Sequence, residues 1–296
     1  MDNSRSMKVV ITGAAGLLGS EFCAAVQNLG WEAVPFTRNE LDLKAAQNAA
    51  GLLEDLAPDV IIHCAAETNV DLCESDPEHA KLINETASHE LALAAQKIGA
   101  KMVYISSCGI FDGLKRTPYT EQDAPSPLTE YAASKYQGEL RVLETSPDNL
   151  ACRVGWLFGG GREQRKNFVE ARRKEAASGG DMVSANDKWG SPTWARDAAE
   201  RIIALVERNA AGVFHVSNTG IASRHDYVSE IVRTFYPSKQ VGSVDSSSFN
   251  RAAPVPDFEA LESKRLDEVG LPPLRSWQDA IQSYVALEYA DLIERG

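Results

Sequence analysis

The sequence has few of the features that mark secreted, membrane-bound or nucleic-acid-binding proteins. No apolar run approaches the roughly 20 residues that a helix needs to span a bilayer. The polar start Met1–Ser6 lacks the apolar core of a signal peptide. The net charge of −12 argues against general binding to nucleic acids or to anionic membranes. We therefore expect a cytoplasmic protein without a nucleic-acid or membrane partner.

Cysteine and histidine are also scarce, with five residues of each. The cysteines show no C-x-x-C pair, and no histidines stand at metal-ligand spacing. We interpret the cysteines as reduced thiols and expect neither disulfides nor a metal. What the chain does have is length and apolar content: 296 residues, 44% of them hydrophobic, suffice for one large α/β domain or for one domain with a smaller partner.

A glycine-rich turn near the start is the first functional signal. Lys8–Thr12 is a short β-branched apolar run, typical of a buried parallel strand. It leads into a turn with glycines at Gly13, Gly16 and Gly19, and a helical pattern follows. Such a turn lets the backbone approach a diphosphate, and the helix N-terminus favours its negative charge. The sequence therefore predicts a dinucleotide-binding turn, and an ordinary strand-to-helix connection is the alternative.

The end of the second expected strand, 31–36, bears on the choice of cofactor. An NAD site usually carries an acid here to bind the ribose 2′-hydroxyl, but this chain continues with Thr37 and Arg38. Arg38 is suited to pair with a 2′-phosphate, which favours NADPH, with NADH as the alternative. Asp42 and Leu43 are predicted either to flank the adenine or, for Asp42, to cap a helix that continues to Leu56.

Three further apolar runs predict strands at 59–66, 101–106 and 150–158, and an amphipathic pattern predicts a helix from about His79 to Ile98. Strict alternation of strands and helices predicts right-handed crossovers and a Rossmann-like doubly wound parallel sheet. Ser107 directly follows the fourth strand, at the sheet edge where ligands bind. A hydroxyl that merely caps a turn is the alternative for Ser107. His63 and His215 lie in apolar runs and are predicted to be core residues.

The stretch Tyr131-Ala-Ala-Ser-Lys135 places a phenol and an ammonium on one face of a helix. A tyrosine beside a fixed positive charge gives up a proton more easily than its usual pKa of about 10 allows. Such a pair suits the reduction of a ketone or the oxidation of an alcohol. The spacing also occurs by chance on surface helices, so it gains weight only from its context.

Beyond residue 152 the alternation stops. A glycine-rich loop at 159–161 precedes a run of basic residues from Arg162 to Lys174. This run predicts either an anion site for a nucleotide diphosphate or a solvated helix face. We expect an NAD(P)-binding domain of residues 1–152 plus about 185–216, and a smaller C-terminal α/β lobe that binds the substrate, about 153–184 plus 217–296.

Taken together, these motifs resemble the dTDP-4-dehydrorhamnose reductase family of the extended short-chain dehydrogenase/reductase superfamily, nearly end to end. The G-x-x-G-x-x-G turn, the serine after the fourth strand and Y-x-x-x-K match the superfamily. The more specific matches are 58–66, 70–71, 74–77, 111–113, 127–128, 153–159, 167–169, 186–187, 190–193 and 196–197.

The resemblance implies NADPH-dependent reduction of a nucleotide-activated 4-keto-6-deoxy sugar, within dTDP-rhamnose and polysaccharide biosynthesis, and leaves a homodimer open. It implies that the catalytic set is Ser107, Tyr131 and Lys135. In this set Tyr131 protonates the developing alkoxide, and Lys135 holds the nicotinamide ribose and lowers the tyrosine pKa. The implied cofactor contacts are Gly13, Gly16, Leu17, Leu18, Gly19, Asp42, Leu43, Ala65, Ala66 and Glu67. The implied substrate contacts are Ser107, Cys108, Trp156, Asn167 and Arg251.

One departure from the family stands beside the catalytic serine. The family usually follows this residue with Asp-Tyr, whereas this chain has Cys108-Gly109. An acid and an aromatic residue expected at the sugar are therefore missing, so the sugar need not be dehydrorhamnose. Two alternatives stay open: a nucleotide-sugar epimerase with bound NAD, and a non-catalytic dinucleotide-binding subunit that resembles the β subunit of methionine adenosyltransferase, to which Glu67 points.

Overall fold

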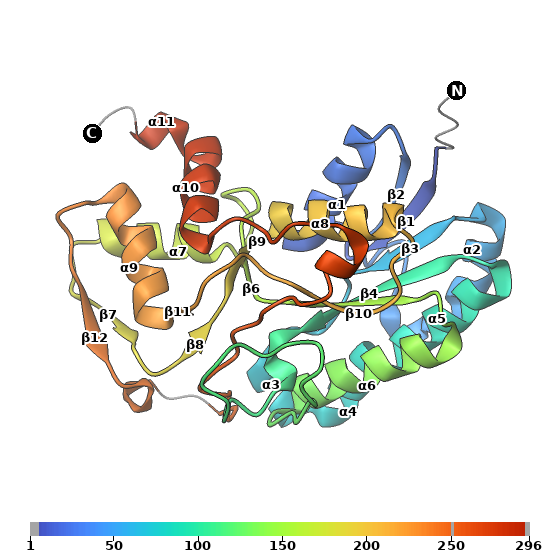
Figure 1. Ribbon diagram of the computed structural model, residues 1–296, viewed down its shortest axis with the longest axis horizontal. Coiled ribbons are helices and arrows are strands. Elements are labelled where there is room, and N and C mark those ends of the chain that lie inside the picture. The colour runs from blue at the N-terminus through green and yellow to red at the C-terminus, as the bar shows by residue number, and fades with distance from the viewer. Residues whose placement is uncertain (1–5, 250–251, 294–296) are drawn as a thin grey trace.

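A six-stranded parallel sheet forms the centre of the larger part of the molecule (Figure 1). The computed structural model describes residues 6–249 and 252–293. The strand order is β10-β5-β4-β3-β1-β2, and every neighbouring pair is parallel. The predicted doubly wound sheet is confirmed, with its topological switch point between β1 and β3. The strands are β1 Lys8–Thr12, β2 Glu32–Phe36, β3 Val60–His63, β4 Lys101–Ser107, β5 Leu150–Val154 and β10 Gly212–Val216.

Helices cover both faces of this sheet, which explains why its strands are apolar on both sides. β3 and β5 are buried at every residue. Helices α1 and α8 pack together over one face, and α2, α5 and α6 lie over the other (Figure 1). Their bounds are α1 Leu17–Asn28, α8 Ala195–Glu207, α2 Ala49–Leu56, α5 Ala87–Ile98 and α6 Glu130–Thr145. Shorter pieces are α3 Val70–Ser75, α4 Pro77–Lys81 and the 3₁₀ turns η1 Leu43–Asn48 and η3 Cys108–Ile110.

The helix expected from His79 to Ile98 differs from the prediction. It starts at Pro77, with Asp76 as its N-cap, and is interrupted by a π-helical turn, η2 Leu82–Thr86. A π turn inserts an extra residue and shifts the side chains that follow it. The amphipathic pattern could not show this interruption, because apolar residues continue on the buried side across it.

The remaining elements form a smaller lobe, seen on the left of Figure 1. Its core is aromatic, with Phe158, Trp194, Tyr227, Trp277 and Tyr284 packed together. Three two-stranded sheets frame it: β6 Trp156–Phe158 with β9 Pro192–Trp194, β7 Met182–Ala185 with β12 Val241–Val244, and β8 Trp189–Gly190 with β11 Ala222–Ser223. The helices are α7 Phe168–Ala177, α9 Arg224–Phe235, α10 Trp277–Glu288 and α11 Ala290–Ile293, with 3₁₀ turns η4 Ser246–Ser248 and η5 Asp267–Val269.

The division of the chain into a dinucleotide-binding domain and a substrate-binding lobe stays a prediction. The chain returns from the small lobe to add α8 over the large sheet and β10 to its edge, which supports assigning residues 195–216 to the dinucleotide-binding part, whereas β8 and β9 belong to the small lobe. In the ranges 6–249 and 252–293, none of the helices is both long and apolar enough to cross a membrane. All five cysteines are free thiols.

Candidate functional site

A cavity of about 940 Å³ opens at the carboxyl ends of strands β1, β3, β4 and β5. It runs from the glycine turn after β1 to Ser107 after β4 and to Tyr131 and Lys135 on α6, the predicted catalytic set. Every predicted cofactor-binding residue lines it: Gly13, Gly16, Leu17, Leu18, Gly19, Arg38, Asp42, Leu43, Ala65, Ala66, Glu67, Tyr131 and Lys135. Parallel strands bring these residues together because all their carboxyl ends meet at one edge.

The glycine turn is held by close backbone contacts that only glycine permits. Gly13 has φ +66°, and a Cβ there would lie 2.8 Å from the Ala65 nitrogen. A Cβ at Gly19 would lie 2.2 Å from the Gly13 oxygen, so helix α1 could not pack against the turn. Gly16 is the N-cap of α1 and offers no side-chain cap, which leaves the first N–H groups of the helix for a ligand.

The turn after β2 lies beside the glycine turn, at the end of the cavity away from Ser107 and Tyr131. Arg38 is exposed and lines the cavity, as does Lys44, a cation that the sequence interpretation did not single out. Asp42 Oδ1 accepts a hydrogen bond from the Lys44 N–H at 3.0 Å, so Asp42 caps η1 and borders the cavity at once. The capping role of Asp42 is confirmed, although the segment up to Leu56 begins as a 3₁₀ turn, and an adenine contact of Asp42 stays a prediction. The two cations make this end attractive to a phosphate.

Asn84, in the π turn η2, ties the cofactor side of the cavity to the catalytic helix. Its side chain accepts from the Glu67 N–H (2.9 Å) and donates to the Glu67 carbonyl (3.0 Å) and to the Ser134 hydroxyl (3.0 Å). Asn84 is only 1% exposed. The sequence interpretation missed this residue, although a polar side chain within an apolar helix face was a signal.

Ser107, Tyr131 and Lys135 all border the cavity. Ser107 ends β4, and Tyr131 lies in the first turn of α6, whose N-cap Thr129 accepts from the Ala132 N–H at 3.1 Å. Lys135, one turn further along, is 4% exposed, and its Nζ lies 4.0 Å from the centre of the Tyr104 ring. The structure thus brings the predicted catalytic set together on one wall.

Burial dominates the electrostatics of this set. It raises the pKa of Tyr131, while a hydrogen bond with Ser107 opposes the rise. The phenol is therefore protonated at neutral pH, which is the form that a proton donor requires. Burial lowers the pKa of Lys135 to about 7, against the opposing pull of Cys64 and Glu139. The lowering of the Tyr131 pKa by Lys135 stays a prediction, because burial and the hydrogen bond with Ser107 are the main influences on this pKa.

Next to Ser107 lies a second group of residues, which we call the sugar-side cluster: Cys108, Gly109, Trp156, Arg224 and Glu259. Cys108 is buried, and Trp156 is 9% exposed. The Trp156 indole N–H donates to Glu259 Oε2 at 2.9 Å, and the Arg224 guanidinium lies 3.5 Å from the centre of the Trp156 ring. The sequence interpretation named Cys108 and Trp156 here but missed Glu259 and Arg224, because no local motif surrounds either one.

Of the predicted substrate residues that the structure describes, Ser107 lines the cavity, and Cys108, Trp156 and Asn167 do not. Asn167 is buried and caps α7 by accepting from the Glu170 N–H at 2.9 Å. Its amide donates to the Gly160 and Gly161 carbonyls and to the Tyr284 hydroxyl, so its polar groups anchor the glycine-rich loop. A substrate contact of Asn167 stays a prediction. Arg251 lies outside the described residues.

The basic run after the glycine-rich loop forms ion pairs within the protein. Arg172 pairs with Glu175 at 2.8 Å, and Arg173 and Lys174 pair with Glu170 at 2.8 and 3.4 Å. Such pairs are typical of a solvated helix face, which was the alternative to an anion site for a nucleotide diphosphate. Lys166 differs, since it lines the large cavity and donates to Thr68 Oγ1 at 2.6 Å.

The two histidines predicted to be structural are core residues. His63 is 1% exposed and hydrogen-bonds Thr12 and Ser88, and burial lowers its pKa to about 3. His215 is fully buried, with its ring against the Tyr119 and Glu262 carbonyls, and burial lowers its pKa to about 4.

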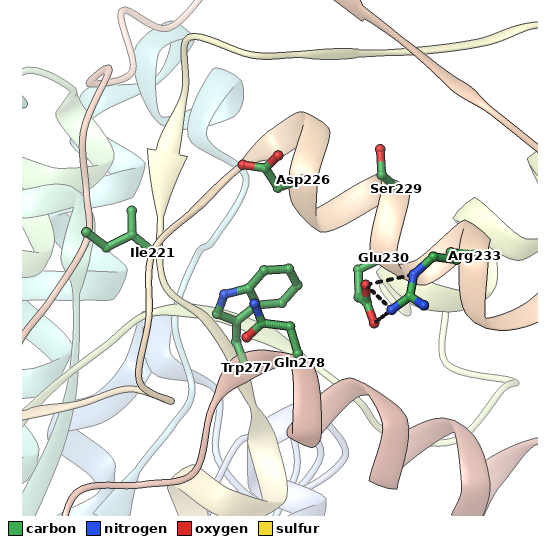
Figure 2. A pocket seen from close by; sticks show the side chains of 7 residues that line it. All are labelled: Ile221, Asp226, Ser229, Glu230, Arg233, Trp277 and Gln278. Carbon is green, nitrogen blue, oxygen red and sulfur yellow. Dashed lines mark hydrogen bonds and ion pairs between the residues drawn. The ribbon is translucent and has the colours of Figure 1, made fainter. Parts of the chain in front are cut away.

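A second cavity of about 370 Å³ lies between α9 and the start of α10 (Figure 2). Glu230 and Arg233 on α9 form an ion pair at 2.7 Å, and Trp277 and Gln278 border the same hollow (Figure 2). Its lining shares no residue with the large cavity, so we assign it no part in the candidate site.

Comparison with known proteins agrees with this geometry. The family described as the RmlD substrate binding domain matches residues 7–289. A dTDP-4-dehydrorhamnose reductase of Mycobacterium tuberculosis (strain H37Rv) is 34% identical over 288 residues, covering 95% of this chain and 93% of the relative. The spore coat polysaccharide biosynthesis protein SpsK of Bacillus subtilis is 32% identical, covering 94% and 96%. The crystal structure of a dTDP-4-dehydrorhamnose reductase from Bacillus anthracis in complex with NADP matches with a TM-score of 0.89 and 30% identity, covering 97% and 100%.

Proposed function

Since the chain belongs to the family of the RmlD substrate binding domain, we propose that it is an NADPH-dependent oxidoreductase that reduces the 4-keto group of a nucleotide-linked 4-keto-6-deoxy sugar. The relative in Mycobacterium tuberculosis carries the name of such a reductase, and the matching structure from Bacillus anthracis contains NADP. The observation that carries the proposal is that Ser107, Tyr131 and Lys135 share one cavity with the glycine turn.

The residues present fit a dinucleotide. The glycine turn has no side chains at Gly13, Gly16 and Gly19 to keep a ligand from its backbone, and the α1 N-terminus beside it has no side-chain cap on its N–H groups. The Ser106 hydroxyl is buried at the cavity wall and has no hydrogen-bond partner among the described residues, so it is available to a bound ligand. Arg38 and Lys44 supply the charge for a 2′-phosphate.

The reaction needs a hydride on the ketone carbon and a proton on its oxygen. A bound nicotinamide supplies the hydride. Tyr131 supplies the proton, since burial keeps its phenol neutral until the alkoxide forms. Ser107 donates to the same oxygen and shares the developing charge. A well-placed donor of this kind is worth about 3–4 kcal/mol of transition-state stabilisation.

Lys135 has two tasks in this scheme. Its ammonium binds the nicotinamide ribose, and its charge stabilises the phenolate left after proton transfer. The position of Lys135 one turn after Tyr131, with the Tyr104 ring beneath its Nζ, holds the ammonium at the cavity wall.

The proposal is tested by NADPH oxidation, followed at 340 nm, with nucleotide-linked 4-keto-6-deoxy sugars as substrates. We expect turnover that depends on added NADPH and a product reduced at C4. An epimerase would instead copurify with NAD and interconvert nucleotide sugars without added cofactor. Binding of NADPH with no turnover on any 4-keto sugar would favour the non-catalytic subunit and refute the proposal.

A further inference from the structure

Glu259 lies on a segment whose backbone is fixed from two sides. Its N–H donates to the Trp189 carbonyl at 2.8 Å, and the next residue, Ala260, accepts from the Tyr119 N–H at 2.8 Å. Its neighbours Phe258 and Ala260 are buried, whereas Glu259 is partly exposed. The alternation of an extended chain therefore turns the Glu259 side chain away from the packed side of the segment.

The Glu259 carboxylate is oriented by the tryptophan beside it. Oε2 accepts the Trp156 indole N–H at 2.9 Å. The Trp156 ring is held in place by its neighbours. It packs so closely on Gly190 that a Cβ there would lie 2.3 Å from the ring, and the Arg224 guanidinium lies 3.5 Å from the ring centre. The carboxylate is thus presented by a rigid support, and Oε1 is directed toward Gly109.

Gly109 connects this carboxylate to the catalytic serine. A Cβ at position 109 would lie 3.1 Å from Glu259 Oε1 and 3.5 Å from Ser107 Oγ. Glu259 Oε1 and Ser107 Oγ therefore both border the place that a side chain at position 109 would occupy. The negative charge of Glu259 also raises the pKa of Cys108 and of Tyr131, which places it within electrostatic range of the proton donor.

We propose that Glu259 binds a hydroxyl group of the keto sugar, the one on the carbon next to the ketone, and so selects sugars that carry a hydroxyl there. The proposal rests on the proposed function, which seats the ketone at Ser107 and Tyr131. A carboxylate accepts hydrogen bonds and donates none, so it matches a hydroxyl donor and rejects a sugar without one.

This assignment also explains the departure at Cys108-Gly109. The acid absent after Ser107 is supplied by a segment far along the chain, and glycine at 109 leaves room for it. A Cβ at position 109 would lie 3.1 Å from Glu259 Oε1, so a larger residue there would press on the carboxylate in its observed position.

The test compares two substrates on four proteins. The substrates are a nucleotide-linked 4-keto-6-deoxy sugar and its 3-deoxy counterpart. The proteins are the wild type, Glu259→Gln, Glu259→Ala and the control Glu262→Gln, an exposed acid on the same segment. The Gln variant keeps an oxygen that can accept the Trp156 N–H, so it removes the charge while keeping the support.

We expect wild-type kcat/KM to be about 10- to 100-fold higher for the 3-hydroxy sugar than for the 3-deoxy sugar, the range of a hydrogen bond to a charged group. Glu259→Gln and Glu259→Ala should remove most of this preference by slowing the 3-hydroxy sugar. The Kd for NADPH should be the same in the Glu259 variants as in the wild type. The control Glu262→Gln should keep the wild-type preference for the 3-hydroxy sugar. A preference that survives in both Glu259 variants, or an equal loss on both sugars, would overturn the assignment while leaving the reductase function intact. A wild type that reduces neither sugar would overturn both.

Discussion

The cofactor cavity and the sugar-side cluster border the same catalytic set but are built in different ways. The cofactor cavity is formed by strand ends and short turns, where each contact is set by backbone geometry within a few residues, as at Gly13 and Gly19. The sugar-side cluster joins Cys108, Trp156, Arg224 and Glu259, which come from four separate segments. Substitutions in the cofactor cavity would disrupt the glycine turn. In the sugar-side cluster, an acid on one segment can replace an acid on another. This difference predicts that the cofactor is a fixed property of the fold and that the sugar is a variable one.

The largest effect is expected at the point where the two regions meet. Tyr131→Phe removes the proton donor and should lower kcat by about 10²–10⁴-fold, the usual range for general acid catalysis. The Kd for NADPH should change by less than about threefold, since the phenol is one of many cavity contacts. Steady-state kinetics and a fluorescence titration of NADPH measure the two quantities. Tyr236→Phe, in the small lobe, is the matched control. Wild-type rates in Tyr131→Phe would show that another group donates the proton.

The next prediction tests the rigidity of the cofactor side. Gly19→Ala would place a Cβ 2.2 Å from the Gly13 oxygen, so α1 must move away from the turn. We expect NADPH affinity to fall by about 100-fold and the free energy of unfolding to fall by about 1–3 kcal/mol. Calorimetric titration and urea unfolding give both values.

Gly51→Ala on α2 is the control for Gly19→Ala, because a Cβ there has no heavy atom within 4 Å. It should leave NADPH binding unchanged and stabilise the helix by about 0.5–1 kcal/mol. Similar NADPH affinities in both variants would mean that the turn does not hold the diphosphate.

A smaller effect is expected for the choice between NADPH and NADH. Arg38→Ala should weaken NADPH binding by about 10-fold and NADH binding by less than about twofold, because Arg38 is suited to contact the 2′-phosphate alone. The ratio of the two Kd values is the measurement, with Arg208→Ala on the surface as the control. Equal losses for the two cofactors would contradict 2′-phosphate recognition by Arg38.

A further prediction concerns the stability of the protein and its dependence on pH. Burial lowers the pKa of Lys135 to about 7, far below the value near 10.4 of an unfolded lysine. Between these two values the unfolded chain binds more protons, so the lysine costs stability at pH 7 and the cost fades as the pH rises toward 10. Lys135→Met should therefore stabilise the cofactor-free protein by about 1–3 kcal/mol at pH 7 and by less at pH 9, while activity is lost. Urea unfolding at both pH values decides this, and an unchanged or lower stability at pH 7 would contradict the charge penalty.

The same contrast explains what could be predicted from the sequence. The strand-turn-helix around Gly13 and the Tyr131–Lys135 pair are contiguous, so their spacing carries the geometry, and the parallel sheet brings them together without further information. The π turn at 82–86 was not predictable, because an apolar helix face does not record an inserted residue. Asn84 left a signal as a polar side chain within that face, but its partners Glu67 and Ser134 are set by tertiary packing. Glu259 was missed because its partners Trp156 and Gly109 are distant in the chain, and only tertiary packing places them together.

The π turn has a consequence for how this enzyme could lose its activity. Deleting one residue from 82–86 would let the interrupted helix continue as regular α-helix, a change that helix geometry itself tolerates. The wider turn that places Asn84 between Glu67 and Ser134 would then be lost. Asn84 would release Glu67 and Ser134, and the loop and the catalytic helix would come apart without any catalytic residue having changed. The site therefore depends on the length of this helix as well as on the side chain at position 84.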